Sequence, residues 1–169
     1  MLEPSVFSRF VKTPFGTFQL SATKRGLAAV RFPRQHFARP KSVKIPPAVR
    51  KHFAGAGRFL NQYLAGRLRK LPVVRIDWDL FSGFDRRVLT ELRKIPTQTT
   101  LTYGDLAKRL RSPRGARAVG NSLNRNPIPI LIPCHRIVRK DRSLGGYGPG
   151  LSWKRLFLNL ERTSLGAAR

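Results

Sequence analysis

The feature that most limits the possible folds of this chain is a proline-spaced run at residues 126–136, with the sequence NPIPILIPCHR. Each proline fixes φ at about −65° and removes a backbone N–H donor, so the run suits neither a helix nor an inner strand of a sheet. Its last three residues are the only cysteine of the chain, Cys134, followed by His135 and Arg136. The run therefore predicts a rigid, irregular segment that presents a thiol.

Two interpretations of Cys134 compete. A free cysteine is commonly a small buried hydrophobic residue, and burial among aliphatic groups raises the pKa of a thiol. Neighbouring imidazole or guanidinium charge instead lowers that pKa from about 8.5 toward neutrality, which produces the nucleophilic thiolate. We favour a reactive thiol because His135 and Arg136 follow it directly.

The charge of the chain indicates its class of partner. The 169 residues include 34 lysines and arginines against 8 aspartates and glutamates, which gives a formal net charge of +26. An excess of this size is typical of proteins that bind nucleic acid, although a generally basic surface or a ribosomal-type protein with charged tails also produces it. Because 41% of the residues are hydrophobic, the chain can bury a core.

The sequence gives no support for a membrane, disulfide or metal class. No run approaches the roughly 18–20 apolar residues of a membrane span, and the N-terminus has no hydrophobic signal core, so we expect a cytoplasmic protein. One cysteine excludes an intrachain disulfide and a multi-cysteine zinc site, and His36, His52 and His135 do not have metal-ligand spacing. We expect no metal and no cofactor.

The first half of the chain has the pattern of a small sheet and a helix. Three strand-like runs separated by turn signals predict an antiparallel meander, at residues 5–12, 15–23 and 27–32. Helical spacing of apolar residues begins at Pro47 and ends at Gly66. We expect residues 71–76 to return to the same sheet as a strand. The domain boundary is expected near residues 77–81, which gives domains 1–78 and 79–169.

The sequence pattern of the second half of the chain predicts a series of helices. Ser82 and Asp85 resemble a capping box for the first, which Pro96 ends, and Ser152 is expected to cap the last.

Between these two helices the sequence predicts a helix-turn-helix. Thr102 opens one helix, and Ser112 with Pro113 is expected to cap another that runs to about Asn124.

This second helix of the pair is rich in small residues. Glycine in a helix interior costs about 0.5–1 kcal/mol relative to alanine, so the close approach of another surface is expected. One interpretation is packing against a neighbouring helix. We favour the other, in which the helix enters a DNA groove and Arg117 inserts into the base stack. The expected DNA contacts are Tyr103, Ala116, Arg117, Ala118, Gly120 and Arg136.

Together these features resemble the O6-alkylguanine-DNA alkyltransferases, also called methylated-DNA–protein-cysteine methyltransferases. The resemblance runs from about Phe81 to Glu161, and its most specific part is the Ile-Pro-Cys-His-Arg core of the proline-spaced run. Three further motifs follow the order and spacing of the family: YGDLA at 103–107, ARAVG at 116–120 and GY at 146–147. The first half resembles the family only in its layout.

The resemblance implies a single-turnover reaction in which Cys134 displaces guanine from the alkyl group and keeps that group. It implies that His135 removes the thiol proton through a water and that Glu161 orients the imidazole. Tyr103 would donate a proton to the leaving guanine, and Asn126 would hold the turn beneath the cysteine. Without the resemblance, Glu161 also fits a surface partner of basic side chains, and Tyr103 a packing residue.

The resemblance also implies a pocket formed by backbone near Cys134 and closed by a glycine-rich loop. The expected substrate contacts are Ile137, Tyr147, Gly148 and Pro149. Many relatives carry paired glycines where this chain has Pro149 and Gly150. Because proline fixes φ and removes an N–H, this difference bears on the mobility of the loop.

We therefore expect an α+β protein, with a small antiparallel sheet plus a helix in its N-terminal domain and a winged-helix-like helix-turn-helix in its C-terminal helical domain. Its expected function is to flip O6-alkylguanine out of double-stranded DNA and to transfer the alkyl group irreversibly to Cys134, as a monomer. Two other classes stay open: a non-catalytic lesion binder, and a helix-turn-helix regulator or ribosomal-type RNA binder.

Overall fold

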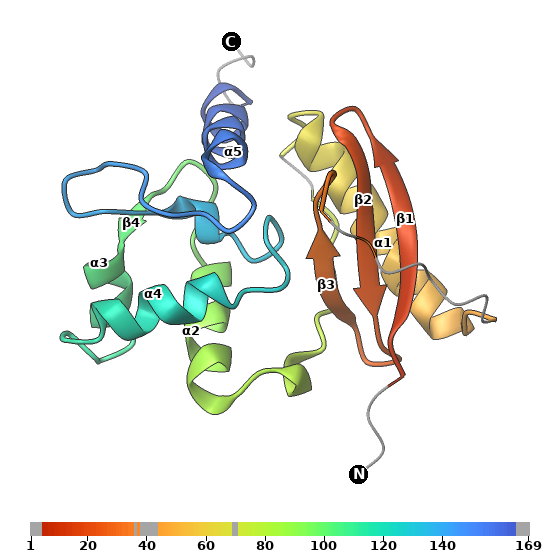
Figure 1. Ribbon diagram of the computed structural model, residues 1–169, viewed down its shortest axis with the longest axis horizontal. Coiled ribbons are helices and arrows are strands. Elements are labelled where there is room, and N and C mark those ends of the chain that lie inside the picture. Colours follow the sequence, from red (N-terminus) through yellow and green to blue (C-terminus); the bar gives the residue numbers. More distant parts are fainter. Residues whose placement is uncertain (1–4, 36, 38–43, 69–70, 165–169) are drawn as a thin grey trace. The chain divides into compact units, whose positions relative to one another are not determined.

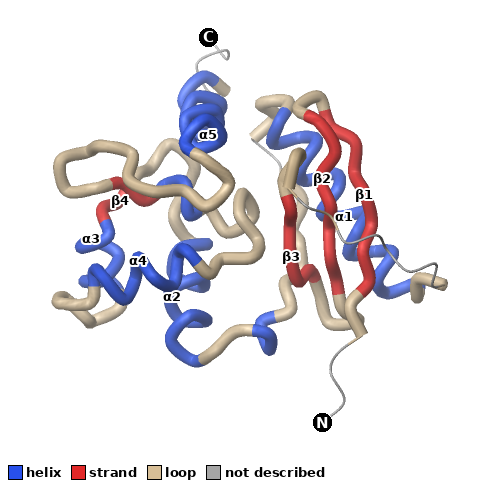
Figure 2. Tube along the Cα trace, viewed as in Figure 1, coloured by secondary structure: helices blue, strands red, loops and turns tan. Residues whose placement is uncertain are grey.

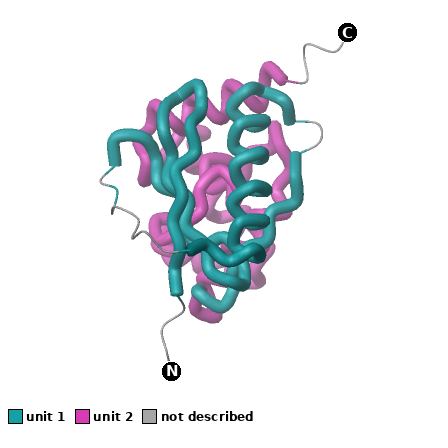
Figure 3. Tube along the Cα trace, turned by 90° about the vertical axis from the view of Figure 1, so that its right-hand side faces the viewer, with its two compact units in different colours: residues 1–80 teal, residues 81–169 magenta. Residues whose placement is uncertain are grey.

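The computed structural model describes residues 5–35, 37, 44–68 and 71–164. The chain divides into two compact units, Met1–Leu80 and Phe81–Arg169 (Figure 3). The sequence predicts the boundary at residues 78 and 79. Over the described residues, no helix is both long and apolar enough to cross a membrane.

The N-terminal unit is an antiparallel sheet backed by a helix (Figure 1). Its strands are β1 (Phe7–Thr13), β2 (Gly16–Ala22) and β3 (Leu27–Arg31), which lie in the order β1-β2-β3. Helix α1 (Pro47–Leu64) packs against all three strands, and the short 3-10 helix η1 (Trp78–Leu80) ends the unit. The predicted meander and its helix are confirmed.

The core of this unit follows from the periodicity of its sequence. Strand β2 buries Phe18, Leu20 and Ala22, which alternate along it. Helix α1 buries one apolar stripe at helical spacing: Val49, Phe53, Ala56, Leu60, Tyr63 and Leu64. In the tight turn between β1 and β2, the Thr13 hydroxyl donates to the Gly16 carbonyl at 2.8 Å. Gly16 there adopts a φ of 109°, which side chains rarely tolerate.

The predicted strand at residues 71–76 is wrong. This segment forms one isolated bridge, between Ile76 and Leu27 of β3. Pro72 has no N–H to offer a ladder, and Val73 is 93% exposed. The part of the segment before the bridge therefore lies off the sheet.

Over its described residues, the C-terminal unit combines helices with one short parallel ladder (Figure 2). Its elements are α2 (Gly83–Arg93), β4 (Leu101–Thr102), α3 (Tyr103–Arg109), α4 (Ala116–Asn124), the single-turn 3-10 helix η2 (Cys134–Arg136), β5 (Ile137–Val138) and α5 (Leu151–Thr163). Helices α2, α3 and α4 pack on one another. Helices α3 and α4, with the turn between them, form the predicted helix-turn-helix.

The parallel ladder positions the thiol segment. It pairs Leu101 with Ile137 and Thr102 with Val138. Strand β4 leads directly into α3, and β5 directly follows η2. The ladder therefore places the start of α3 beside the segment that carries Cys134.

The capping box lies at a different helix from the predicted one. Ser82 is the N-cap residue of α2 but makes no side-chain capping hydrogen bond, and the Asp85 carboxylate pairs with Arg125 at 2.7 Å instead. A complete capping box occurs at α3. Thr102 Oγ1 accepts from the Asp105 N–H at 3.1 Å, and the Asp105 carboxylate accepts from the Thr102 N–H at 3.0 Å.

The last two helices also begin at other residues than predicted. Helix α4 begins at Ala116 because residues 112–115 form a turn, in which the Gly115 N–H donates to the Ser112 carbonyl at 2.7 Å. Helix α5 begins at Leu151, after Gly150 with a φ of 108°. Ser152 therefore lies in the first turn of α5 and not at its cap.

We expect Gly26→Ala to destabilise the N-terminal unit. A Cβ at residue 26 would lie 2.6 Å from both the Asp77 N and the Ile76 C atoms, so the backbone that crosses there must shift. Overpacking of this kind costs about 1–3 kcal/mol. The control is Gly55→Ala in α1, where a Cβ meets nothing within 4 Å, so a gain of about 0.5–1 kcal/mol is expected. Urea unfolding of the full chain measures the free energy of unfolding of both variants. An unchanged free energy for Gly26→Ala would contradict the close approach of the backbone at residue 26.

Candidate active site

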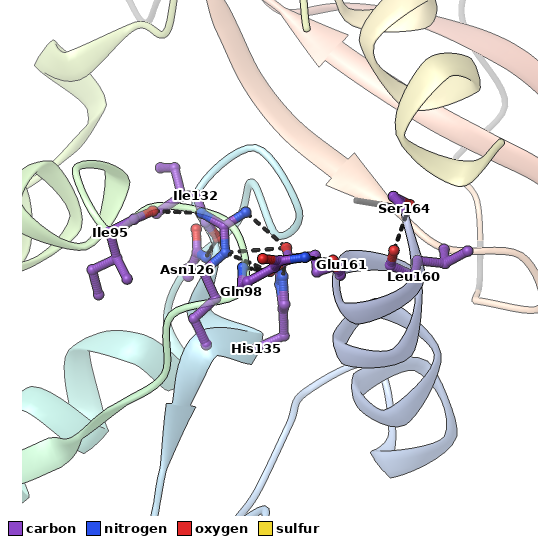
Figure 4. A network of polar contacts seen from close by, with 9 residues as sticks. Ile95, Gln98, Asn126, Ile132, His135, Leu160, Glu161 and Ser164 are labelled. Atoms are coloured by element: carbon purple, nitrogen blue, oxygen red, sulfur yellow. Dashed lines mark hydrogen bonds and ion pairs between the residues drawn. The ribbon is translucent and has the colours of Figure 1, made fainter. Parts of the chain in front are cut away.

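The thiol lies on a turn that one amide side chain holds in place. Cys134 opens η2, and its N–H donates to the Ile132 carbonyl at 2.8 Å. Asn126 Nδ2 donates to the same carbonyl at 3.0 Å (Figure 4). It also donates to Cys134 Sγ at 3.2 Å. Asn126 Oδ1 accepts from the Ile128 N–H at 3.0 Å. Asn126 thus joins the beginning of the proline-spaced run to its end.

The same run holds a strained residue. Ile130 has a φ of 75°, a left-handed conformation that a β-branched residue rarely adopts. Such strain costs on the order of 1–3 kcal/mol and persists only where the surrounding structure imposes it. Here Ile130 is 2% exposed, and the Ile132 N–H closes the turn by donating to the Ile128 carbonyl at 3.0 Å.

A buried carboxylate lies beside this turn. Glu161 of α5 is 1% exposed and accepts from His135 Nε2 at 2.8 Å. It also accepts from Arg136 Nε at 3.0 Å and Nη2 at 2.7 Å, and from the main-chain N–H of Gln98 at 3.2 Å (Figure 4). Arg136 Nη1 donates to the Ile95 carbonyl at 2.5 Å. The carboxylate therefore joins η2, α5 and the segment that follows α2.

The charges of this cluster follow from its hydrogen bonds. Burial raises the pKa of Glu161, but hydrogen bonds from His135 and Arg136 outweigh it and lower the pKa to about 2. Burial lowers the pKa of His135 below its usual value, against the effect of Glu161. At neutral pH the pair is thus a charged carboxylate and a neutral imidazole. Because a carboxylate only accepts, Nε2 carries the ring proton and Nδ1 is the basic nitrogen.

The resting state of Cys134 differs from the sequence prediction. The residue keeps some exposure, yet burial of its thiol raises the pKa to about 11, against the Asn126 hydrogen bond and the charge of Lys154. His135 is neutral, and the Arg136 guanidinium is bound to Glu161. The predicted lowering of the pKa by these two neighbours is therefore wrong. The thiol is protonated at neutral pH and needs a base.

Tyr103 lies between α4 and the loop that follows β5. A Cβ built at Gly120 of α4 would be 3.7 Å from its ring, and one built at Gly145 would be 3.2 Å from its hydroxyl. Burial raises the pKa of Tyr103, against the charge of Arg139, and Cys134 raises it further. The hydroxyl therefore stays protonated at neutral pH and can donate a hydrogen bond.

The predicted DNA contacts fall into two groups. Arg117 and Ala118 of α4 are exposed, while Ala116 and Gly120 are half-buried. Arg136, in contrast, is 7% exposed, and its guanidinium is bound to Glu161. The prediction that Arg136 contacts DNA is wrong because the buried carboxylate takes its donors.

Of the predicted pocket residues, Ile137 directly follows the thiol turn and Tyr147 lies beside His135. Ile137 is fully buried and Gly148 is exposed, while Tyr147 and Pro149 are half-buried. The ring of Tyr147 is edge-on to His135, with centroids 6.5 Å apart. The structure thus brings Tyr147 beside the imidazole.

Two site residues carry no prediction from the sequence: Gln98, which donates to Glu161, and Lys154, which binds the backbone next to the thiol turn. Lys154 is fully buried on α5, and its Nζ donates to the Ile137 carbonyl at 2.6 Å. Burial lowers its pKa to about 8. Within the described residues, no three histidine, cysteine, aspartate or glutamate side chains are grouped as a metal site requires.

Comparison with known proteins places this geometry in a family. A family model described as 6-O-methylguanine DNA methyltransferase, DNA binding domain, matches residues 83–163. The chain is 35% identical to a methylated-DNA–protein-cysteine methyltransferase of Methanosarcina acetivorans over 153 residues. The aligned region covers 89% of this chain and 94% of that protein. The chain belongs to the methylated-DNA–protein-cysteine methyltransferase family. The resemblance read from its motifs is confirmed.

Other methylated-DNA–protein-cysteine methyltransferases are similar over most of their length. The one of Mycolicibacterium paratuberculosis is 38% identical over 157 residues, 91% of each chain. The crystal structure of Mycobacterium tuberculosis OGT in complex with DNA is 34% identical and matches with a TM-score of 0.78 over 93% of each chain.

We expect Cys134 to be a slow thiol at neutral pH. Only the thiolate reacts with iodoacetamide, and the thiol pKa is about 11. Alkylation, followed by the mass of the Cys134 peptide, should be slower at pH 7 than that of free cysteine and should still increase above about pH 9. A rate at pH 7 equal to that of free cysteine would contradict the raised pKa.

Proposed function

We propose that the protein repairs double-stranded DNA by transferring the alkyl group of O6-alkylguanine to Cys134. The observation that carries this proposal is the cluster in which Glu161 holds a neutral His135 next to Cys134 on its fixed turn. A nucleophile, a base and a group that orients the base are the parts that covalent catalysis requires. Family membership supports the same reaction.

The proposed reaction balances without a cofactor. His135 Nδ1 takes the thiol proton through a water, and Sγ attacks the alkyl carbon. The S–C bond forms as the bond from carbon to O6 breaks, and the electron pair of that bond goes to the guanine. Tyr103 donates a proton to the leaving base, an effect typically worth about 10²–10⁴-fold. Because the thioether is stable, each molecule reacts once.

Other residues would position the substrate. Asn126 holds the thiol turn through its three hydrogen bonds. We infer that the backbone near Ile137 and the loop residues Tyr147, Gly148 and Pro149 line the pocket for the flipped guanine. The closeness of Tyr147 to His135 supports this assignment.

The C-terminal unit would also bind the DNA. Exposed Arg117 on α4 would fill the space of the flipped base, and Ala116, Ala118 and Gly120 would let α4 approach the groove. A hollow of about 460 Å³ beside α2 and α3 is lined by Glu91, which pairs with Lys94 at 2.9 Å, and by basic side chains suited to phosphate contacts: Arg86, Arg87, Lys94, Arg109 and Arg111. The relative of known structure was crystallised with DNA.

We propose that the protein acts as a monomer in the cytoplasm. The residues of the proposed site all belong to the C-terminal unit, so the reaction needs no second copy. A nucleophilic thiol must stay reduced, which suits the cytosol.

Incubation with duplex DNA that contains O6-methylguanine tests the proposed function. We expect the Cys134 peptide to gain one methyl group, with no more than one per protein molecule. Cys134→Ser should gain none while binding the duplex with nearly the same affinity, because phosphate contacts dominate binding. If the unchanged protein binds the methylated duplex but gains no methyl group, a non-catalytic lesion binder would be favoured. Tight binding of a particular unmodified sequence would favour a regulator.

Arg117→Ala separates base flipping from chemistry. Flipping costs a few kcal/mol, and a side chain that fills the vacated space offsets part of this cost. We expect the variant to react at least about 10-fold more slowly with alkylated duplex, equivalent to about 1.4 kcal/mol, but nearly normally with free O6-alkylguanine base. Arg155→Ala on α5 removes the same charge and serves as the control. Equal losses on both substrates would show that Arg117 supports the fold or the pocket.

A further inference from the structure

Lys154 is a buried cation to which the reaction above assigns no role. Its Nζ donates to the main-chain carbonyls of Ile137 at 2.6 Å, of Leu144, and of Gly146 at 3.5 Å. The residue is 0% exposed. Burial of an unpaired ammonium is so costly that these acceptors are needed to keep it in the core.

The three acceptors belong to two different segments. Ile137 directly follows the η2 turn that carries Cys134, whereas Leu144 and Gly146 lie in the loop between β5 and α5. One side chain therefore fastens the thiol turn and this loop to α5. The loop continues into Tyr147, whose ring packs edge-on to Phe157 of α5 with centroids 6.2 Å apart.

The charge of Lys154 also reaches the thiol. It lowers the pKa of Cys134, and the thiolate in turn raises the pKa of Lys154. The charge of Arg139 lowers the pKa of Lys154. The charge of Lys154 in turn lowers the pKa of His135. The hydrogen-bond partners of Lys154 named above are carbonyls, so they carry no formal charge that would cancel its own.

We propose that Lys154 is a positioning residue that clamps the loop at residues 144–146 to the thiol turn and stabilises the Cys134 thiolate as it forms. Lys154 thus supplies the positive charge that Arg136, bound to Glu161, does not. This inference rests on the proposed function, in which Cys134 is the nucleophile.

The test compares two variants of neighbouring residues. Lys154→Met keeps the length of the side chain but removes its charge and its donors. Arg155→Met, the control, removes a charge from the exposed next residue of α5. Cys134 in the full chain is alkylated with iodoacetamide from about pH 6.5 to about pH 10, and its peptide is weighed. Hydrogen exchange of the loop amides is measured in parallel.

We expect Lys154→Met to slow alkylation about tenfold near pH 7, which equals one unit of thiol pKa. The difference should close to less than about twofold near pH 10, because Lys154 of the unchanged protein, with a pKa of about 8, is then neutral. Exchange at residues 144–146 should be at least about tenfold faster. Arg155→Met should match the unchanged protein in both measurements.

Equal reactivity of Lys154→Met and the unchanged protein would overturn the proposal, as would unchanged loop exchange. A loss by the same factor at every pH would also overturn it, because a merely structural defect does not follow the titration of Lys154. If Lys154→Met does not unfold cooperatively, Lys154→Gln, which keeps two N–H donors without the charge, must show the same pH-dependent difference.

The unchanged protein gives a test that needs no variant. Its alkylation rate should rise clearly less than tenfold between about pH 8 and about pH 9, as Lys154 loses its proton, and more steeply again above that range. A steady tenfold increase per pH unit over this range would overturn the proposal. Because iodoacetamide requires no DNA, a protein that shows this behaviour but gains no methyl group from alkylated DNA would overturn only the proposed function.

Discussion

The rest of the site depends on the buried carboxylate of Glu161. Its oxygens accept from His135 and Arg136 of η2 and from the main chain of Gln98, which lies in the segment after α2. A carboxylate buried without such partners is strongly destabilising, whereas here its pKa is lowered to about 2. The same contacts fix the imidazole with Nδ1 as its basic nitrogen. One ion cluster therefore determines both the local fold and the protonation states beside the thiol.

This arrangement separates positioning from activation. The proline-spaced run and Asn126 fix Cys134 in space, while burial keeps its thiol protonated at rest. In the proposed reaction, activation then requires a base, His135, and a charge that favours the thiolate, for which we propose Lys154. A thiol with a raised pKa should react slowly with general electrophiles, and in the proposed reaction it is activated only within its own pocket. For a protein consumed by a single reaction, such selectivity prevents loss of the nucleophile.

The sequence predicts those elements whose signals are local. The meander, α1 and the buried faces of α2 and α3 follow from apolar periodicity, and the thiol turn follows from its prolines. The side-chain direction of Arg136 is not a local property, because its partner Glu161 lies 25 residues further along the chain. The burial of Lys154 could have been predicted from its spacing, since Lys154, Phe157 and Glu161 share one buried stripe of α5. Gln98 gives no such indication, because its hydrogen bonds join it to Glu161, 63 residues further along the chain.

The state of His135 is the most direct test of this account. The chain contains three histidines, so nitrogen NMR of the ring signals, assigned with His135→Gln, can follow His135 through a pH titration. The account predicts a neutral ring protonated on Nε2 at pH 7, with a midpoint below the usual value of about 6.5. A charged ring at pH 7, or a neutral ring protonated on Nδ1, would contradict it.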